Sequence, residues 1–157
     1  MSPTDEKKII FTAQSKKFFY CRDAICAYVL KQGCVPLNPF RVFEYFLGDR
    51  VHRDLVRQAN FNLIRVADEL WVFGRDIADG VLAEIKYAHG LDKPIRAFTI
   101  GNRVREIREV PYDHVRFENE ILSESLDRQR ARAILYEHQE PHVRKNENDN
   151  LQGKLFQ

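Results

Sequence analysis

The chain has 157 residues, of which 44% are hydrophobic and 31% are charged. This length supplies one hydrophobic core but is short for two typical domains. The formal net charge of +2, from 25 basic and 23 acidic residues, argues against a nucleic-acid binder, which carries a marked basic excess. The opening residues are polar, and no stretch approaches the ~20 apolar residues that span a bilayer. We therefore expect a soluble, cytoplasmic protein with no membrane partner.

Short apolar runs alternate with helical patterns along the chain. In order, they predict a strand over Lys8–Thr12, a helix over Phe18–Gln32, a strand over Cys34–Leu37, a helix over Val51–Val66 and a strand over Glu69–Phe73. A helix over Gly80–Gly90, a strand over Pro94–Ile100, a shorter fifth strand over Arg105–Val110 and a charged helix over Glu118–Tyr136 follow.

Three local signals refine these elements. Gly33 is placed to end the first helix, and Pro36 predicts that the second strand lies at an edge of the sheet or ends there. Asn38-Pro39-Phe40 predicts a turn. The second helix has apolar residues at the spacing of one helical face, namely Val51, Leu55, Ala59, Leu63 and Val66.

Strands that alternate with helices predict a parallel sheet covered on both faces. We expect a single α/β domain, a flavodoxin-like or Rossmann-like sandwich with four or five parallel strands, over residues 1–137. A polar, loose tail over 138–157 follows. In such sheets ligands bind beyond the carboxyl ends of the strands. This rule selects three loops, at Ala13–Lys17, Asn38–Phe40 and Gly74–Gly80.

The third helix carries the most informative pair of residues. Glu84 lies in its second turn, and Gly80 lies one turn earlier on the same face. An exposed glycine inside a helix costs about 1 kcal/mol relative to alanine, which suggests that its missing side chain has a use. The missing side chain at Gly80 would allow a ligand to approach Glu84 closely. The alternative is that Gly80 only begins the helix and that Glu84 is solvated.

The segment from Ala67-Asp68 through Gly80-x-x-x-Glu84 to Lys93-Pro94 resembles the nucleoside 2-deoxyribosyltransferase-like superfamily, which includes deoxynucleoside-monophosphate N-glycosidases. The amino-acid sequence of this segment is more similar to those of uncharacterised bacterial and phage members than to those of the characterised enzymes. The resemblance implies that Glu84 is the nucleophile and that the protein is an N-glycosidase or N-glycosyltransferase acting on a nucleoside or nucleotide. It also implies a homo-oligomer, such as a dimer, and no cofactor.

The chain departs from that superfamily where the leaving base needs a proton donor. Asn60 stands where the family has an aspartate, and an amide is not an acid. Ala78 replaces a second aspartate, which leaves Asp79 either to substitute for it or to cap the helix. An alternative function is therefore a non-catalytic nucleotide-binding or sensor module. A third is a protein adaptor that uses the aromatic segment 40–46.

The turn Gln14-Ser15-Lys16-Lys17 precedes a helix and suits phosphate, since free N–H groups point out of a helix start. The resemblance assigns phosphate contacts to Ser15 and Lys16, and a solvated turn is the alternative. The predicted substrate-binding residues are thus Gln14, Ser15, Lys16, Asn38, Asn60, Asp79 and Gly80. Arg53 and Arg57 either add charge to this site or form an exposed helix face.

Metal and disulfide chemistry find no support in the spacing of the residues concerned. None of the five histidines stands at metal-ligand spacing with cysteine or aspartate. Cys21, Cys26 and Cys34 are odd in number and unpaired in spacing, which argues against a disulfide framework. Cys21 and Cys26 fall in an apolar helical stretch, so we expect these two to be buried thiols.

Overall fold

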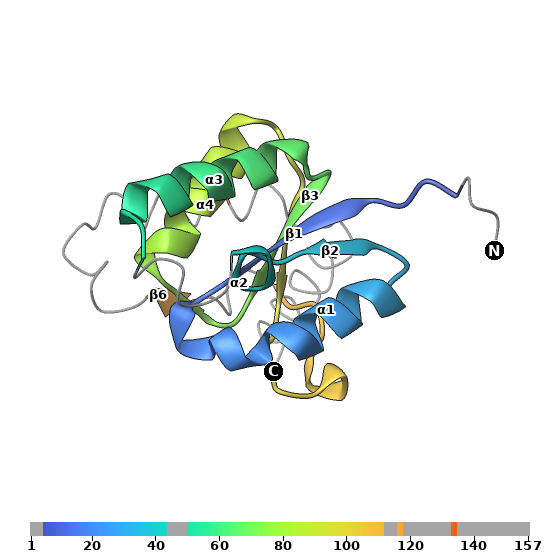
Figure 1. Cartoon of the computed structure of the whole chain (residues 1–157). Helices are drawn as coiled ribbons and strands as arrows, with labels where there is room; N and C mark the ends of the chain where they lie inside the picture. Colours follow the sequence, from blue (N-terminus) through green and yellow to red (C-terminus); the bar gives the residue numbers. More distant parts are fainter. Residues whose placement is uncertain (1–4, 44–49, 112–115, 118–132, 135–157) are drawn as a thin grey trace, which may run out of the picture.

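The computed structural model describes residues 5–43, 50–111, 116–117 and 133–134. Its centre is a four-stranded sheet in the order β2-β1-β3-β5, and every neighbouring pair is parallel. The strands are β1 (Ile9–Gln14), β2 (Val35–Leu37), β3 (Glu69–Phe73) and β5 (Ile95–Phe98). The predicted α/β class and the first four of the five predicted strands are confirmed (Figure 1).

Helices cover both faces of this sheet (Figure 1). The helix α1 (Arg22–Lys31) packs on one face, and α3 (Arg53–Val66) and α4 (Asp79–Gly90) pack on the other. Side chains alternate between the faces along each strand. On β1, for example, Phe11 joins the core beneath α3 and α4, and Ile10 joins the core beneath α1.

The first helical segment differs from its prediction. It begins as a 3-10 helix, η1 (Lys16–Cys21), and Phe18 has non-helical backbone angles before α1 continues the turn. The predicted end is confirmed, because Gly33 has φ +78 just beyond α1. That left-handed conformation favours glycine, which has no Cβ to clash.

Asn38 does more than turn the chain. It caps the short helix α2 (Pro39–Val42), and its side chain accepts a hydrogen bond from the Phe40 N–H. Pro39 stands at the first helical position, where its missing N–H is not needed.

The predicted fifth strand is not a strand of the parallel sheet. Its first residues form a 3-10 helix, η3 (Val104–Glu106), and the next ones return antiparallel along β5 with a single bridge between Phe98 and Glu109. A two-stranded parallel pair, β4 (Asp76–Ile77) with β6 (Arg116–Phe117), was not predicted. Of the predicted helix over Glu118–Tyr136, only 133–134 are described, and they are helical.

The helix α3 forms as predicted, but the apolar spacing does not mark its buried side. Leu55 and Val66 are each 59% exposed, and Ile64, nearly opposite Leu55 on the helix, is buried. Among the described helices, none has the length and apolar character needed to cross a membrane.

Candidate active site

Three segments that carry predicted site residues lie at the carboxyl ends of three neighbouring strands. Gln14 ends β1, Asn38 follows β2, and the loop after β3 leads into α4. Because the three strands are parallel and adjacent, these segments lie at the same end of the sheet, which is formed by the carboxyl ends of the strands. The topology therefore brings to one edge the three loops that the sequence selected.

Gln14 and Asn38 meet in a buried hydrogen-bond network. Asn38 Nδ2 donates to Gln14 Oε1 and to Thr12 Oγ1, both over 2.8 Å. Gln14 Nε2 donates to the Phe18 carbonyl over 2.7 Å, and Asn38 Oδ1 accepts from the Phe40 N–H over 3.0 Å. Both N–H groups of the Asn38 amide are thus used inside the protein, so Asn38 holds β1, β2 and α2 together.

Thr12 is a member of this network that the sequence analysis missed. It stands two residues before Gln14 on the same strand, so the two side chains point to the same face. The sequence could have indicated this role, because Thr12 is a polar residue inside the buried run Ile9–Gln14 and such a residue needs a hydrogen-bond partner. Its spacing of two residues from Gln14 points to that partner.

Ser15 connects β1 to η1, and Lys16 is the first residue of η1. Ser15 is buried, and its Oγ accepts from the Lys17 N–H over 3.4 Å, which is the role of a cap. Lys16 is exposed. Phosphate binding at this turn stays a prediction.

Glu84 is an ionisable group whose pKa is strongly shifted by burial. Its side chain is buried on α4, and burial raises its pKa from 4.5 to about 8, because the charged form loses its hydration. No hydrogen bond reaches the carboxyl group from any part of the chain that the structure describes. At neutral pH the carboxyl group is therefore mostly protonated and able to donate a hydrogen bond.

Gly80 lies one turn before Glu84, and the two share a face of α4. A methyl group added at Gly80 would meet no atom of the rest of the protein within 4 Å. Helical side chains tend to lean toward the helix start, yet a methyl group at Gly80 would lie more than 4 Å from every atom of the Glu84 side chain. Gly80 is exposed, which leaves the approach to Glu84 from this turn free of a side chain.

Asp79 does not cap α4, in contrast to the expectation from its position. The helix begins one residue earlier, with Ala78 as its N-cap and no side-chain hydrogen bond there. Asp79 instead occupies the first turn, where a negative charge is favourable, and forms an exposed pair with Arg57 over 3.8 Å. Arg53 and Arg57 are both exposed on α3.

Asn60 carries a second polar group without a partner. Its Oδ1 is buried, and no hydrogen bond from the described residues reaches it. It lies one turn before the buried Ile64 on α3, and α3 runs beside α4, where the rings of Phe61 and Tyr87 are 4.6 Å apart. A buried acceptor without a donor is rare and calls for an explanation, such as a ligand.

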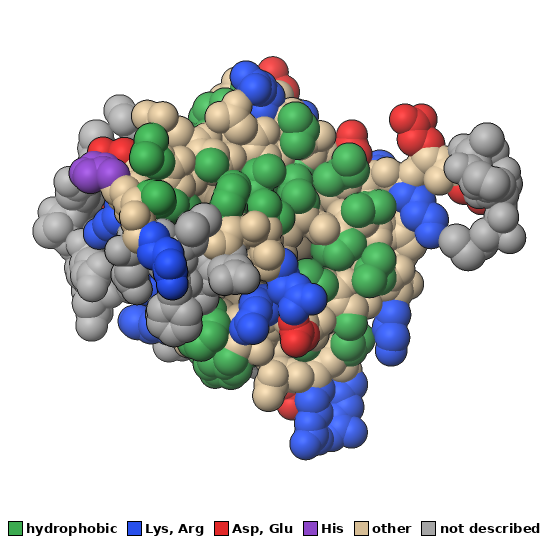
Figure 2. All heavy atoms as spheres, in the orientation of Figure 1, with side chains coloured by type: hydrophobic (Ala, Val, Ile, Leu, Met, Phe, Trp, Pro, Cys, Tyr) green, Lys and Arg blue, Asp and Glu red, His purple; other side chains and the backbone are tan. Residues whose placement is uncertain are grey.

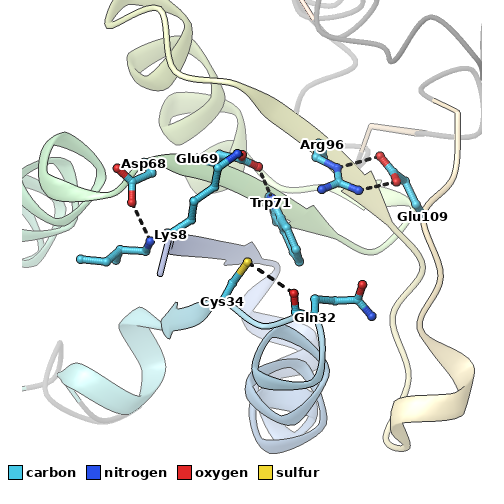
Figure 3. Close-up of polar contacts among 9 residues, drawn as sticks. Lys8, Gln32, Cys34, Asp68, Glu69, Trp71, Arg96 and Glu109 are labelled. Carbon is cyan, nitrogen blue, oxygen red and sulfur yellow. Dashed lines mark hydrogen bonds and ion pairs between the residues drawn. The ribbon is translucent and has the colours of Figure 1, made fainter. Parts of the chain in front are cut away.

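A separate polar cluster surrounds Trp71 on the face of the sheet that α1 covers (Figure 3). Lys8 Nζ donates to Glu69 over 2.7 Å, Trp71 Nε1 donates to the same carboxylate over 2.8 Å, and Arg96 binds Glu109 through two nitrogens. The sequence analysis missed it, although Glu69 and Arg96 stand out within apolar strands. It lies on the opposite face of the sheet from α4, the helix that carries Glu84, and stabilises the fold.

The described residues contain no group of three or more histidine, cysteine or acidic side chains that could hold a metal ion. Cys21 is buried as expected, while Cys26 and Cys34 are half-buried and all three are free thiols. Burial raises the pKa of the Cys21 and Cys26 thiols, which keeps them protonated and poorly reactive.

One family model matches the chain, over residues 11–98, and its description is Domain of unknown function (DUF7768). The match covers more than half of the chain and includes every predicted site residue from Gln14 to Glu84. No curated protein matches the sequence.

Proposed function

The chain belongs to the DUF7768 family, whose description names no activity, and from its own residues we propose that it cleaves or transfers the N-glycosidic bond of a nucleoside or nucleotide through Glu84. One observation carries the proposal: a buried carboxyl group without a partner among the described residues, in the first half of α4, beside the carboxyl ends of the strands. Ionisable groups with strongly shifted pKa values gather at active sites.

The chemistry needs the ionised form of Glu84. The carboxylate attacks the anomeric carbon, the bond from that carbon to the base nitrogen breaks, and the base leaves with the electron pair. Water then hydrolyses the glycosyl ester, or a second base displaces the glutamate, and the configuration is retained. Since burial raises the pKa of Glu84 to about 8, turnover should increase as the pH rises toward that value.

Asn60 supports the leaving base in this scheme. Its unpartnered Oδ1 accepts from an N–H of the base, and its amide nitrogen donates to a ring nitrogen or carbonyl. An amide supplies no proton, so the departing base takes its proton from solvent. Bases that leave easily are therefore the preferred substrates.

The test is base release followed by liquid chromatography. Wild type, Glu84→Gln and Asp92→Asn would each meet ribo- and deoxyribonucleosides, their monophosphates and NAD. Asp92 is exposed just beyond α4 and has φ 55, a conformation that asparagine also adopts. We expect release by wild type and by Asp92→Asn, and none by Glu84→Gln. Equal release by Glu84→Gln would refute the nucleophile, and no release at any pH would refute the activity.

A non-catalytic nucleotide-binding module is the second candidate, and the protonated state of Glu84 favours it. A neutral carboxyl group on α4 and an unpartnered amide oxygen on the neighbouring α3 could each hydrogen-bond a nucleotide without any chemistry. In that case nucleotides stabilise the protein against heat, Glu84→Gln keeps most of the affinity, and no free base appears.

A further inference from the structure

Arg57 is a charged residue of α3 that the proposed reaction does not use. It lies one helical turn before Phe61, whose ring packs 4.6 Å from the ring of Tyr87, so Arg57 is on the side of α3 that faces α4. Its Nη2 lies 3.8 Å from Oδ2 of Asp79, in the first turn of α4. The guanidinium group is therefore held beside the turn of α4 that precedes Glu84.

The contact between Arg57 and Asp79 is weak. A separation of 3.8 Å is too long for a hydrogen bond, and the two side chains are 48% and 72% exposed. A pair this exposed contributes little to stability. A guanidinium group has five N–H donors, yet no hydrogen bond joins Arg57 to any residue in the described part of the chain. Arg57 is therefore available to another anion.

Arg53 adds a second positive charge to the same side of α3. It lies one turn before Arg57, is exposed, and forms no ion pair with a residue that the structure describes. Figure 2 shows hydrophobic side chains gathered over the visible side of α3. The two arginines thus do not belong to an evenly charged helix surface.

Gly80 leaves room for an anion at this place. It directly follows Asp79, and a methyl group added to it would meet no atom of the rest of the protein within 4 Å. One helical turn, about 5 Å, separates Gly80 from Glu84. That separation is on the scale of the distance between the anomeric carbon of a sugar and its phosphate group.

We propose that Arg57 is a specificity residue of the Glu84 site: it binds a phosphate group of the substrate, so that nucleotides are preferred to nucleosides. This inference rests on the proposed function. The planar guanidinium group matches two oxygens of a phosphate with paired N–H donors. In the free protein the carboxylate of Asp79 lies where the phosphate binds, and the phosphate displaces it.

The test is the affinity of the full chain for ribo- and deoxyribonucleosides and for their monophosphates, measured by isothermal titration calorimetry. Wild type binds the monophosphates about tenfold more tightly. Arg57→Gln loses this preference, and its unchanged affinity for nucleosides shows that it is folded. Arg57→Lys keeps the charge and part of the preference. Arg65→Gln is the matched control, because Arg65 is also exposed on α3 but lies about two turns farther along. It keeps the full preference.

Asp79→Asn separates a binding role of Arg57 from a structural one. It removes the carboxylate that competes with the phosphate, so the affinity for monophosphates increases, by about threefold for a pair this exposed. If the pair only joined the two helices, the affinity would be unchanged or lower.

Four results would overturn the assignment: no binding of any monophosphate, equal affinity of wild type for nucleosides and monophosphates, a preference that survives in Arg57→Gln, or one that Arg65→Gln also loses. Base release, measured separately, distinguishes this inference from the proposed function. Release that is independent of Arg57 leaves the chemistry of Glu84 standing without the phosphate contact. Binding that depends on Arg57, without release, leaves the phosphate contact standing without the chemistry.

Discussion

Asn38 and Gln14, which follow and end two neighbouring strands, share a hydrogen bond of 2.8 Å between buried amides. The same Asn38 amide nitrogen also donates to Thr12 Oγ1, and its oxygen caps α2. The Asn38 side chain thus fixes the relative positions of β1, β2 and α2 at the carboxyl ends of the strands, where we place the active site.

Replacing Asn38 by alanine should therefore destabilise the protein. The change leaves two buried acceptors without donors and removes a helix cap, which costs about 2–4 kcal/mol in the free energy of unfolding. Urea denaturation followed by circular dichroism measures this loss. Asn62→Ala, at an exposed asparagine of α3, should cost less than half as much. Equal losses would mean that the Asn38 network contributes little.

Glu84 should make the stability fall as the pH rises. The folded protein holds the carboxyl proton up to pH about 8, whereas the unfolded chain releases it near pH 4.5, so the folded state binds more protons between those values. The contribution of Glu84 to the free energy of unfolding is then greatest below pH 4.5, decreases by up to about 1.4 kcal/mol per pH unit toward pH 8, and levels off above.

Glu84→Gln removes this titration, and urea denaturation at pH 5 and pH 8 would reveal it. We expect the variant to lose clearly less stability than wild type between the two pH values, with Asp92→Asn behaving as wild type does. A Glu84→Gln variant that loses as much stability as wild type between the two pH values would show that Glu84 is ionised and hydrated when folded.

Gly80→Ala should separate stability from binding. The added methyl group meets open space on an exposed helix, so the protein gains about 1 kcal/mol in the free energy of unfolding. If ligands approach Glu84 past Gly80, the same methyl group weakens nucleotide binding. Gly90→Ala, in the last turn of the same helix and equally unobstructed, is the control. Thermal shifts with nucleotide should decrease for Gly80→Ala and stay unchanged for Gly90→Ala.

The two ion pairs with the shortest arginine contacts should differ in strength. Arg96 and Glu109 are 30% and 26% exposed, and Arg96 also lies 4.9 Å from the centroid of the Trp71 ring. Glu109→Ala should cost about 1–2 kcal/mol and shift the emission of Trp71, the single tryptophan of the chain. Asp23→Ala breaks the more exposed pair with Arg41, and it should cost at most about 0.5 kcal/mol. Equal losses in urea denaturation would contradict the ranking.

Several features could be predicted from the sequence because they depend on local spacing. Short patterns predict the four strands and the edge position of β2. They also predict that Glu84 lies one helical turn after Gly80. The buried side of α3 could not be predicted, since the helix carries apolar residues on two sides and periodicity does not say which side meets the sheet. Asp79 was misplaced as a cap because helix starts commonly vary by one or two residues.

The hydrogen bonds of the site also lay beyond sequence reasoning. Gln14 and Asn38 are 24 residues apart, and only the pairing of β1 with β2 brings their amides together. The state of Glu84 depends in the same way on the side chains that bury it. Spacing identified the carboxyl group but did not show that it lacks a partner among the described residues.

Pro36, in the middle of β2, also determines how the open edge of the sheet behaves toward other extended chains. The Val35 N–H points inward and donates to the Lys8 carbonyl over 2.8 Å, so the outward position of this three-residue strand belongs to Pro36, which has no N–H. An unfolded segment therefore finds no amide donor in β2 on which to add a further strand. The edge that carries exposed apolar side chains is in this way protected from fibril growth.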